Sequence, residues 1–244
     1  MIVFRNILFW IGFLIITPIL FIVMLCAAPL PSRIRHYTGV AWARSVLWLL
    51  KHAIGLSYQV EGRENIPKEP SIICCKHQSG YETLALQSIF PHQIFVLKKE
   101  LLYLPILGQG LMLMSPIPID RKEAVQASQK LLEIGLKRKK LGFWISIFPE
   151  GTRTQPGVRG RYKRGAARMA QNLQMNIVPV AMNSGEFWSR RSKLLQPGIV
   201  HFVILPTIAW DSDSVEKIAQ KYEDVIETAQ KEIEGQGPFF IQQK

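Results

Sequence analysis

A histidine and a glutamate just after a short apolar run have the types and spacing of an acid–base pair. The run, Ser71–Cys75, predicts a buried strand, with His77 at its C-terminal mouth. Open α/β sheets keep their chemistry at that edge. Glu82 lies five residues later, in the first turn of a helix that Ser79 would cap, so its carboxylate can turn back towards the imidazole. A carboxylate on one ring nitrogen raises the basicity of the other, which suits the histidine to remove a proton from a hydroxyl.

The same spacing also fits a purely structural role. Ser79-x-x-Glu82 is a capping box, in which the glutamate returns to the backbone N–H of the cap residue. Taken alone, the stretch favours the capping role. A second polar stretch, Phe148–Arg153, follows another apolar strand at Phe143–Ile147 and favours the acid–base pair instead. We therefore expect two polar constellations to open onto the same edge of one sheet.

The second stretch has the composition of a phosphate pocket. Glu150-Gly151-Thr152-Arg153 contains small residues whose backbone N–H groups can face a ligand, and the Arg153 guanidinium matches a phosphate bidentately. Arg121 stands at a similar strand end and is a second candidate phosphate ligand. The charges from Arg159 to Arg164 are typical of a solvated basic loop.

Several other kinds of site are excluded by their motifs. The sequence has no Gly-x-Ser-x-Gly elbow and no Gly-Lys-Ser/Thr loop, and Gly108-Gln-Gly110 lacks the third glycine of a dinucleotide fingerprint. The other histidines lack ligand spacing, so we expect no metal centre and no bound cofactor. Three cysteines give no disulfide framework, which indicates a reducing compartment.

The charge balance indicates anionic partners. Among 244 residues, Lys and Arg number 30 against 18 acids, for a formal charge of +12. Nucleic acid, an acidic lipid surface or phosphorylated substrates are all compatible with that balance.

The N-terminus is predicted to enter a membrane. No charge occurs from Asn6 to Ser32, and Ile7–Leu25 is apolar over about the ~20 residues that span a bilayer core. A retained anchor is favoured over a cleaved signal peptide, and a helix that dips in and returns is also possible because Pro18 can kink it. The next segment, Tyr37–Leu56, fits a helix at the membrane interface or an ordinary core helix.

These segments predict a two-part chain, with membrane-anchoring helices in residues 1–56 and an α/β domain in residues 57–244. Removing the first part should leave a chain that is more soluble but poorly active on a membrane-borne substrate. In the second part, apolar runs alternate with helical patterns, and the last helix fits Asp213 to Gly235. The alternation predicts an α/β fold with a largely parallel sheet flanked by helices. The predicted strands are 72–75, 94–97, 117–119, 143–148, 177–182 and 202–205.

Four blocks of this sequence resemble those of the 1-acylglycerol-3-phosphate O-acyltransferase family, over roughly Gln59 to Leu205. The blocks are His77-x4-Glu82, Ile119-Asp120-Arg121, Phe148-Pro-Glu-Gly-Thr-Arg153 and Ile177-Val-Pro-Val-Ala-Met182. The resemblance implies that His77 is the general base, that Arg153 and Arg121 hold the phosphate of the acceptor, and that the fourth block lines the acyl-chain region. The family usually has Asp where this chain has Glu82.

The reaction implied is acyl transfer from acyl-CoA or acyl carrier protein to the sn-2 hydroxyl of 1-acylglycerol-3-phosphate, giving phosphatidic acid. Backbone N–H groups near Gly151 would stabilise the oxyanion. The resemblance implies a cytoplasmic or inner membrane location, with the catalytic domain facing the cytoplasm. Another acceptor, such as a lyso-ornithine lipid, remains an alternative. A non-catalytic basic membrane protein that binds nucleic acid or anionic lipid is a second one, but only Tyr162 interleaves the basic stretch, so we expect no nucleic-acid partner.

Overall fold

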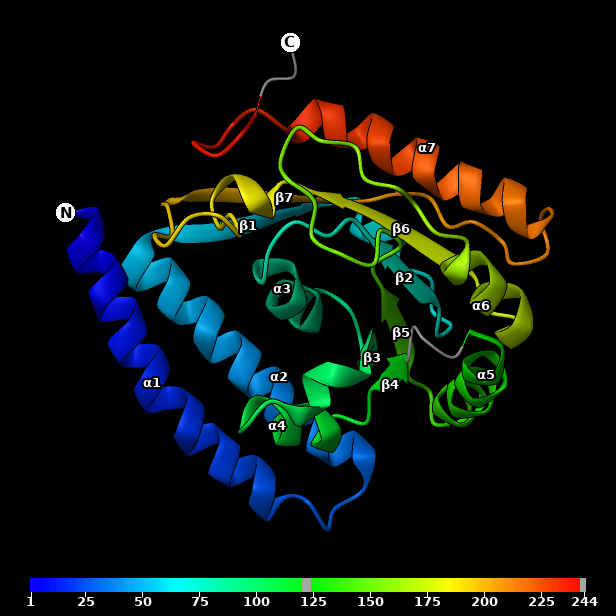
Figure 1. Ribbon diagram of the computed structural model, residues 1–244, viewed down its shortest axis with the longest axis horizontal. Coiled ribbons are helices and arrows are strands. Elements are labelled where there is room, and N and C mark those ends of the chain that lie inside the picture. The colour runs from blue at the N-terminus through cyan, green and yellow to red at the C-terminus, as the bar shows by residue number, and fades with distance from the viewer. Residues whose placement is uncertain (120–123, 242–244) are drawn as a thin grey trace.

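A seven-stranded sheet forms the centre of the molecule (Figure 1). The computed structural model describes residues 1–119 and 124–241, with the side chains of helix α5 from Leu132 onward. The strand order is β1-β7-β6-β2-β5-β3-β4; β6 and β7 are antiparallel, and every other neighbouring pair is parallel. The strands are β1 (Leu56–Glu61), β2 (Ile72–Cys75), β3 (Gln93–Lys98), β4 (Ile117–Ile119), β5 (Trp144–Ile147), β6 (Ile177–Met182) and β7 (Gly198–Ile204).

Helices cover both faces of the sheet, so the predicted α/β class and largely parallel sheet are confirmed. Helix α3 lies with α1 and α2 on one face, whereas α6 and α7 pack on the other (Figure 1). The helices are α1 (Ile2–Cys26), α2 (Ser32–Leu49), α3 (Tyr81–Ile89), α4 (Leu107–Leu113), α5 (Ala124–Lys140), α6 (Gly165–Leu173) and α7 (Val215–Ile233).

Strand β1 was not predicted, because the apolar segment before it reads as one helix as far as Leu56. In the structure α2 ends at Leu49 and a π-helical turn, Leu50–Ile54, follows it. Gly55 then adopts a left-handed conformation, with φ of +84°, which ends the turn and redirects the chain into the strand. The predicted segment is therefore a helix, a turn and the first residue of an edge strand.

Strand β2 is central and explains where the polar stretches meet. All four of its residues are buried, and it pairs in parallel with β5 on one side and β6 on the other. The carboxyl ends of parallel strands meet at the same edge of a sheet. The residues that follow β2, β5 and β6 are therefore neighbours, as the sequence predicted for the first two.

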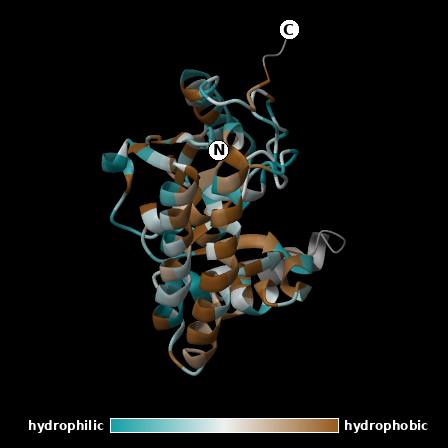
Figure 2. Ribbon diagram, turned by 90° about the vertical axis from the view of Figure 1, so that its left-hand side faces the viewer, coloured by the Kyte–Doolittle hydropathy of each residue, from teal (hydrophilic) through white to brown (hydrophobic). Residues whose placement is uncertain are grey.

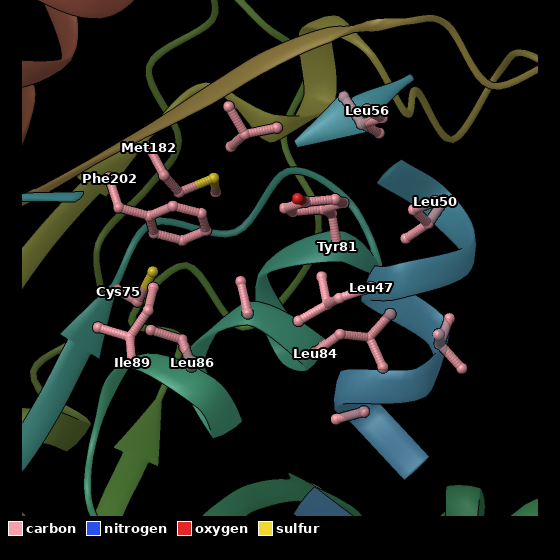
Figure 3. Close-up of a cluster of buried hydrophobic side chains, with 14 of the residues drawn as sticks. Leu47, Leu50, Leu56, Cys75, Tyr81, Leu84, Leu86, Ile89, Met182 and Phe202 are labelled. Carbon is pink, nitrogen blue, oxygen red and sulfur yellow. The ribbon is translucent and has the colours of Figure 1, made fainter. Parts of the chain in front are cut away.

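The N-terminal helices share a hydrophobic core with the α/β domain. Leu47 and Leu50 pack with Tyr81 and Leu84 of α3 and with side chains of the sheet (Figure 3). Helix α2 nevertheless exposes Trp48 on its other side, so it is a core helix with one free face. The division into membrane-anchoring helices in residues 1–56 and an α/β domain in residues 57–244 stays a prediction. In the structure the two parts share one core.

Helix α1 lies against the domain on one side and exposes apolar side chains on the other. Asn6 is buried and exchanges two hydrogen bonds with the backbone of Leu195, at 3.0 and 2.8 Å. Phe9 is fully buried, and its ring contacts that of Trp188. The helix is long and apolar enough to cross a membrane, yet little of it is buried. Its outward side, which is largely hydrophobic in Figure 2, includes Phe4, Ile7, Ile11, Leu14, Ile15, Ile19 and Ile22.

The shared core changes the expected effect of N-terminal truncation. Deleting residues 1–56 removes Leu47, Leu50 and Ile54, which are all buried, and uncovers α3. We therefore expect residues 57–244 to lose cooperative unfolding and to aggregate, because a large apolar surface becomes exposed. Deleting residues 1–31 removes α1 alone, and we expect that chain to unfold cooperatively at a lower temperature. Thermal unfolding followed by circular dichroism in detergent compares the two, and a cooperative transition for residues 57–244 would contradict the shared core.

Candidate functional site

Three strand ends supply the site. His77 follows β2, Glu150 follows β5 and Ser184 follows β6, and hydrogen bonds connect all three regions. The loop after β5 crosses the end of β2, where Thr154 N–H donates to the carbonyl of His77 at 2.8 Å. The predicted meeting of the two polar stretches at one edge of the sheet is confirmed.

His77 and Glu82 form a close pair. Nδ1 of His77 lies 2.7 Å from Oε1 of Glu82. The carboxylate is fully buried, whereas the His77 side chain is 15% exposed. An ionised carboxylate accepts the proton of Nδ1, which leaves the lone pair of the neutral ring on Nε2. The histidine is thus held in the tautomer of a general base.

The carboxylate of Glu82 accepts hydrogen bonds from several other donors. Its Oε1 takes the backbone N–H groups of Gln78 and Ser79, both at 2.8 Å. Its Oε2 takes the hydroxyl of Ser79 at 2.7 Å and that of Ser184 at 2.6 Å. The capping contact and the contact with His77 are therefore made together by one carboxylate, so the two interpretations of the spacing are not alternatives.

These donors stabilise the ionised form of the Glu82 carboxyl. Burial by itself would raise the pKa of the Glu82 carboxyl, but hydrogen bonds from His77, Ser184 and Ser79 outweigh it, and the pKa lies below its ordinary value. Glu82 is therefore ionised at neutral pH. A fixed negative charge beside the ring stabilises the imidazolium that forms when Nε2 takes a proton.

An aromatic ring sets the plane of the imidazole. Phe148, the first residue of the second polar stretch, stacks on His77 with ring centroids 4.0 Å apart and an interplanar angle of 15°. Phe95 of β3 stacks in turn on Phe148, at 6.0 Å. The ring of His77 is thus held by Glu82 at one nitrogen and by Phe148 on one side.

Glu150 is turned inward. Its Oε2 accepts the backbone N–H of His77 at 2.8 Å, and its Oε1 accepts the hydroxyl of Thr154 at 3.1 Å. Burial raises the pKa of this carboxyl, although the Lys76 ammonium opposes the shift. In this structure Glu150 fixes the chain at His77, and its predicted contact with substrate stays a prediction.

The rest of the second polar stretch is more exposed. Arg153 is exposed and lies beside the mouth of the site, since a Cβ added to Gly80 would stand 3.6 Å from its Nη2. Thr152 is also exposed. Gly151 has φ of +66°, and its N–H donates to the carbonyl of Phe148 at 2.9 Å, so that group is engaged in the turn and not free for an oxyanion. Arg121 lies outside the described residues.

Three residues of the site were not expected from the sequence. Ser184 lies two residues after the end of a predicted strand, so the rule that chemistry follows strand ends could have found it. Phe148 is the first residue of the block Phe148–Arg153, but no sequence pattern indicates that its ring stacks on that of His77. Lys76 precedes His77 and binds groups more than seventy residues away, for which no local signal exists.

The chain is similar to proteins of one enzyme family. Residues 57–183 match the family model described as "Acyltransferase". The 1-acyl-sn-glycerol-3-phosphate acyltransferase of Pseudomonas aeruginosa is 38% identical over 192 residues, covering 78% of this chain and 75% of that protein. The enzyme of that name from Saccharomyces cerevisiae is 33% identical and covers 82% of this chain and 68% of its own length.

A solved structure has the same fold. The crystal structure of the 1-acyl-sn-glycerophosphate acyltransferase from Thermotoga maritima superposes with a TM-score of 0.76, covering 95% of this chain and 97% of that one. The two sequences are 21% identical, so this likeness concerns the fold alone.

Replacing Glu82 with Gln removes the negative charge of the side chain and keeps its size and shape. The amide keeps an oxygen for the two backbone N–H groups, and Ser79 and Ser184 can accept from its NH₂ group, but it cannot stabilise an imidazolium. We expect turnover to fall by about 10²-fold or more with little change in melting temperature. Thr83→Val, which removes a hydroxyl bonded to Gly80 O in the same helical turn, is the matched control and should keep its activity. Retained activity together with lost stability in Glu82→Gln would mean that the residue is only a cap.

Glu82 also predicts a pH dependence of stability. Because its pKa is lowered in the folded state, the ionised carboxyl contributes stability that is complete above the ordinary value of about 4.5 and is lost as the pH falls through the lowered pKa. As the pH falls from about 5 to 3, the wild type should therefore lose unfolding free energy relative to Glu82→Gln, whose amide does not titrate, whatever small difference the two show at neutral pH. Denaturant titrations at several pH values measure it, and a constant difference would contradict the assigned charge.

Proposed function

The chain belongs to the acyltransferase family, and on that premise we propose that it moves a fatty acyl group from a thioester to the sn-2 hydroxyl of 1-acylglycerol-3-phosphate, giving phosphatidic acid. The observation that carries the proposal is the contact of 2.7 Å between His77 and Glu82 at the carboxyl edge of the sheet. Arg153 lies beside this pair, near Gly80. A base aimed at a hydroxyl and a cation for a phosphate are what this acceptor requires.

The residues support direct transfer without a covalent enzyme intermediate. Nε2 of His77 takes the proton of the acceptor hydroxyl as its oxygen attacks the thioester carbonyl. Glu82 remains ionised and stabilises the imidazolium. When the tetrahedral intermediate collapses, the C–S bond breaks and the departing thiolate takes the proton from His77, which leaves an ester, a free thiol and the neutral base.

Two observations favour a phosphate-bearing acceptor. Relatives from a bacterium and a yeast carry the name 1-acyl-sn-glycerol-3-phosphate acyltransferase. Arg153 has its guanidinium near Gly80, three residues from His77. A lyso-ornithine lipid has no phosphate monoester for that guanidinium to bind.

The acyl donor is acyl-CoA or acyl carrier protein. Either supplies a thioester whose thiolate leaves readily, and neither is a bound cofactor. We infer that the donor arrives from the cytoplasm, on which side the catalytic domain lies, while the lysolipid acceptor stays in the bilayer.

The packing of α1 supports a helix pair that enters the membrane from one side. Asn6 and Phe9 near one end of α1, and Met24 near the other, are all buried against the rest of the protein. A helix packed at both ends against the α/β domain cannot cross the bilayer unless that domain enters it too. Its exposed apolar side can instead enter the lipid, with α2 returning the chain to the domain (Figure 2).

A panel of lysolipids tests the proposal. The purified full-length protein in mixed micelles receives radiolabelled acyl-CoA or acyl carrier protein with 1-acylglycerol-3-phosphate, lysophosphatidylglycerol, lysophosphatidylcholine or lyso-ornithine lipid. We expect the phosphate monoester to react fastest. Faster transfer to lyso-ornithine lipid would overturn the acceptor, and no transfer to any of them would overturn the function.

Arg153→Lys tests the assignment of the phosphate. Lysine keeps the charge but loses the bidentate fork, so the KM for 1-acylglycerol-3-phosphate should rise by roughly 10-fold while the KM for the acyl donor barely moves. Saturation curves with one substrate varied at a time measure both. Arg190→Lys, an exposed arginine on another loop, is the matched control. A defect confined to the donor curve would place the donor phosphates at Arg153 instead.

A further inference from the structure

Lys76 is a buried lysine directly before the catalytic histidine. Successive residues of an extended chain point to opposite faces, and Cys74 and Cys75 already lie in the two separate cores of the sheet. Lys76 continues this alternation towards α7, away from the imidazole of His77. Its side chain is only 2% exposed. A buried ammonium is costly unless it is paired, so its partners reveal what it does.

Two carboxylates and a phenol surround the ammonium. Nζ of Lys76 lies 2.5 Å from Oε1 of Glu227 in α7 and 3.5 Å from Oε1 of Glu150. The hydroxyl of Tyr162 donates to the same oxygen of Glu227 at 2.6 Å, and Nζ lies 5.8 Å from the centre of its ring. Lys76 thereby connects the last helix of the chain to the second polar stretch.

The connection reaches the backbone of the base. Glu150 accepts the N–H of His77, and Thr154, whose hydroxyl binds Glu150, donates its own N–H to the carbonyl of His77. Both backbone polar groups of the histidine are therefore held by the loop after β5. Lys76 supplies a positive charge on the inner side of that loop.

We propose that Lys76 and Glu227 are positioning residues for acyl transfer, which hold Glu150 and through it the backbone of His77 from the face of the sheet opposite the imidazole. This inference rests on the proposed function, since it concerns the same base. Without Lys76, the carboxylates of Glu150 and Glu227 would be left without their shared cation in a buried place. Glu150 would then take up a proton or move, and His77 would lose its fixed distance from Glu82 and from the acceptor. A displacement of about 1 Å can cost 10²-fold in rate.

A cavity makes this proposal testable by chemical rescue. Lys76 lines a cavity of about 620 Å³ that opens between α7 and the loop at Gly157–Arg159, with Glu227 and Gln230 also in its wall. Truncating Lys76 to alanine removes three methylene groups and the amine, which is the composition of propylamine. A small ammonium can therefore enter from the cavity and replace the missing group.

The experiment uses the full-length protein in mixed micelles. We expect Lys76→Ala to lower kcat for acyl transfer to 1-acylglycerol-3-phosphate by roughly 10- to 100-fold, with the KM for that acceptor little changed because Lys76 does not face the mouth of the site. Propylammonium should restore kcat several-fold, and propan-1-ol, which has the same size without the charge, should not. Arg164→Met, which breaks an exposed ion pair between Arg164 and Glu216 of α7 at 2.7 Å, is the matched control and should retain the wild-type kcat.

The outcomes separate this inference from the proposed function. An inactive wild type would contradict the function, whereas a folded Lys76→Ala protein with the wild-type kcat would overturn the inference alone. Equal rescue by propan-1-ol would also overturn it, because filling space would then suffice. If Lys76→Ala does not fold, the isosteric Glu227→Gln should lower kcat in the same direction, and a wild-type kcat in that variant would overturn the proposal.

Discussion

The carboxylate of Glu82 is the group on which the site depends. It is fully buried and accepts hydrogen bonds from Gln78, Ser79 and Ser184 in addition to His77. Burying a negative charge is unfavourable unless donors replace its water, and here those donors come from the end of β2, the start of α3 and the end of β6. The fold is thus arranged so that one anion can exist in its interior beside a histidine that remains accessible.

Contacts hold both the backbone and the ring of His77. Phe148 stacks on the imidazole, while Glu150 and Thr154 bind the N–H and the carbonyl of the same residue. These groups belong to one loop after β5, so that loop holds His77 at the edge of the sheet. Trp188 connects the site to helix α1, since it lies near Gly80 and its ring contacts that of Phe9.

Much of this arrangement follows from local patterns. The strands Ile72–Cys75, Ile117–Ile119 and Ile177–Met182 have the predicted bounds, because short apolar runs bounded by polar residues carry a strong signal. The contact between His77 and Glu82 could be predicted because it spans five residues. The contact of Ser184 with Glu82 spans 102 residues and depends on the pairing of β6 with β2. No local pattern in the sequence predicts that pairing. The same holds for Lys76 and Glu227, which are 151 residues apart.

The most direct test of the account is the turnover of His77→Ala with 1-acylglycerol-3-phosphate and a thioester donor, measured on protein whose melting temperature is also recorded. His77 is partly exposed and packs mainly through its ring, so the variant should fold. The account predicts a fall of ~10²–10⁴-fold in kcat, which is the usual contribution of a general base. A folded His77→Ala protein that turns over like the wild type would contradict it.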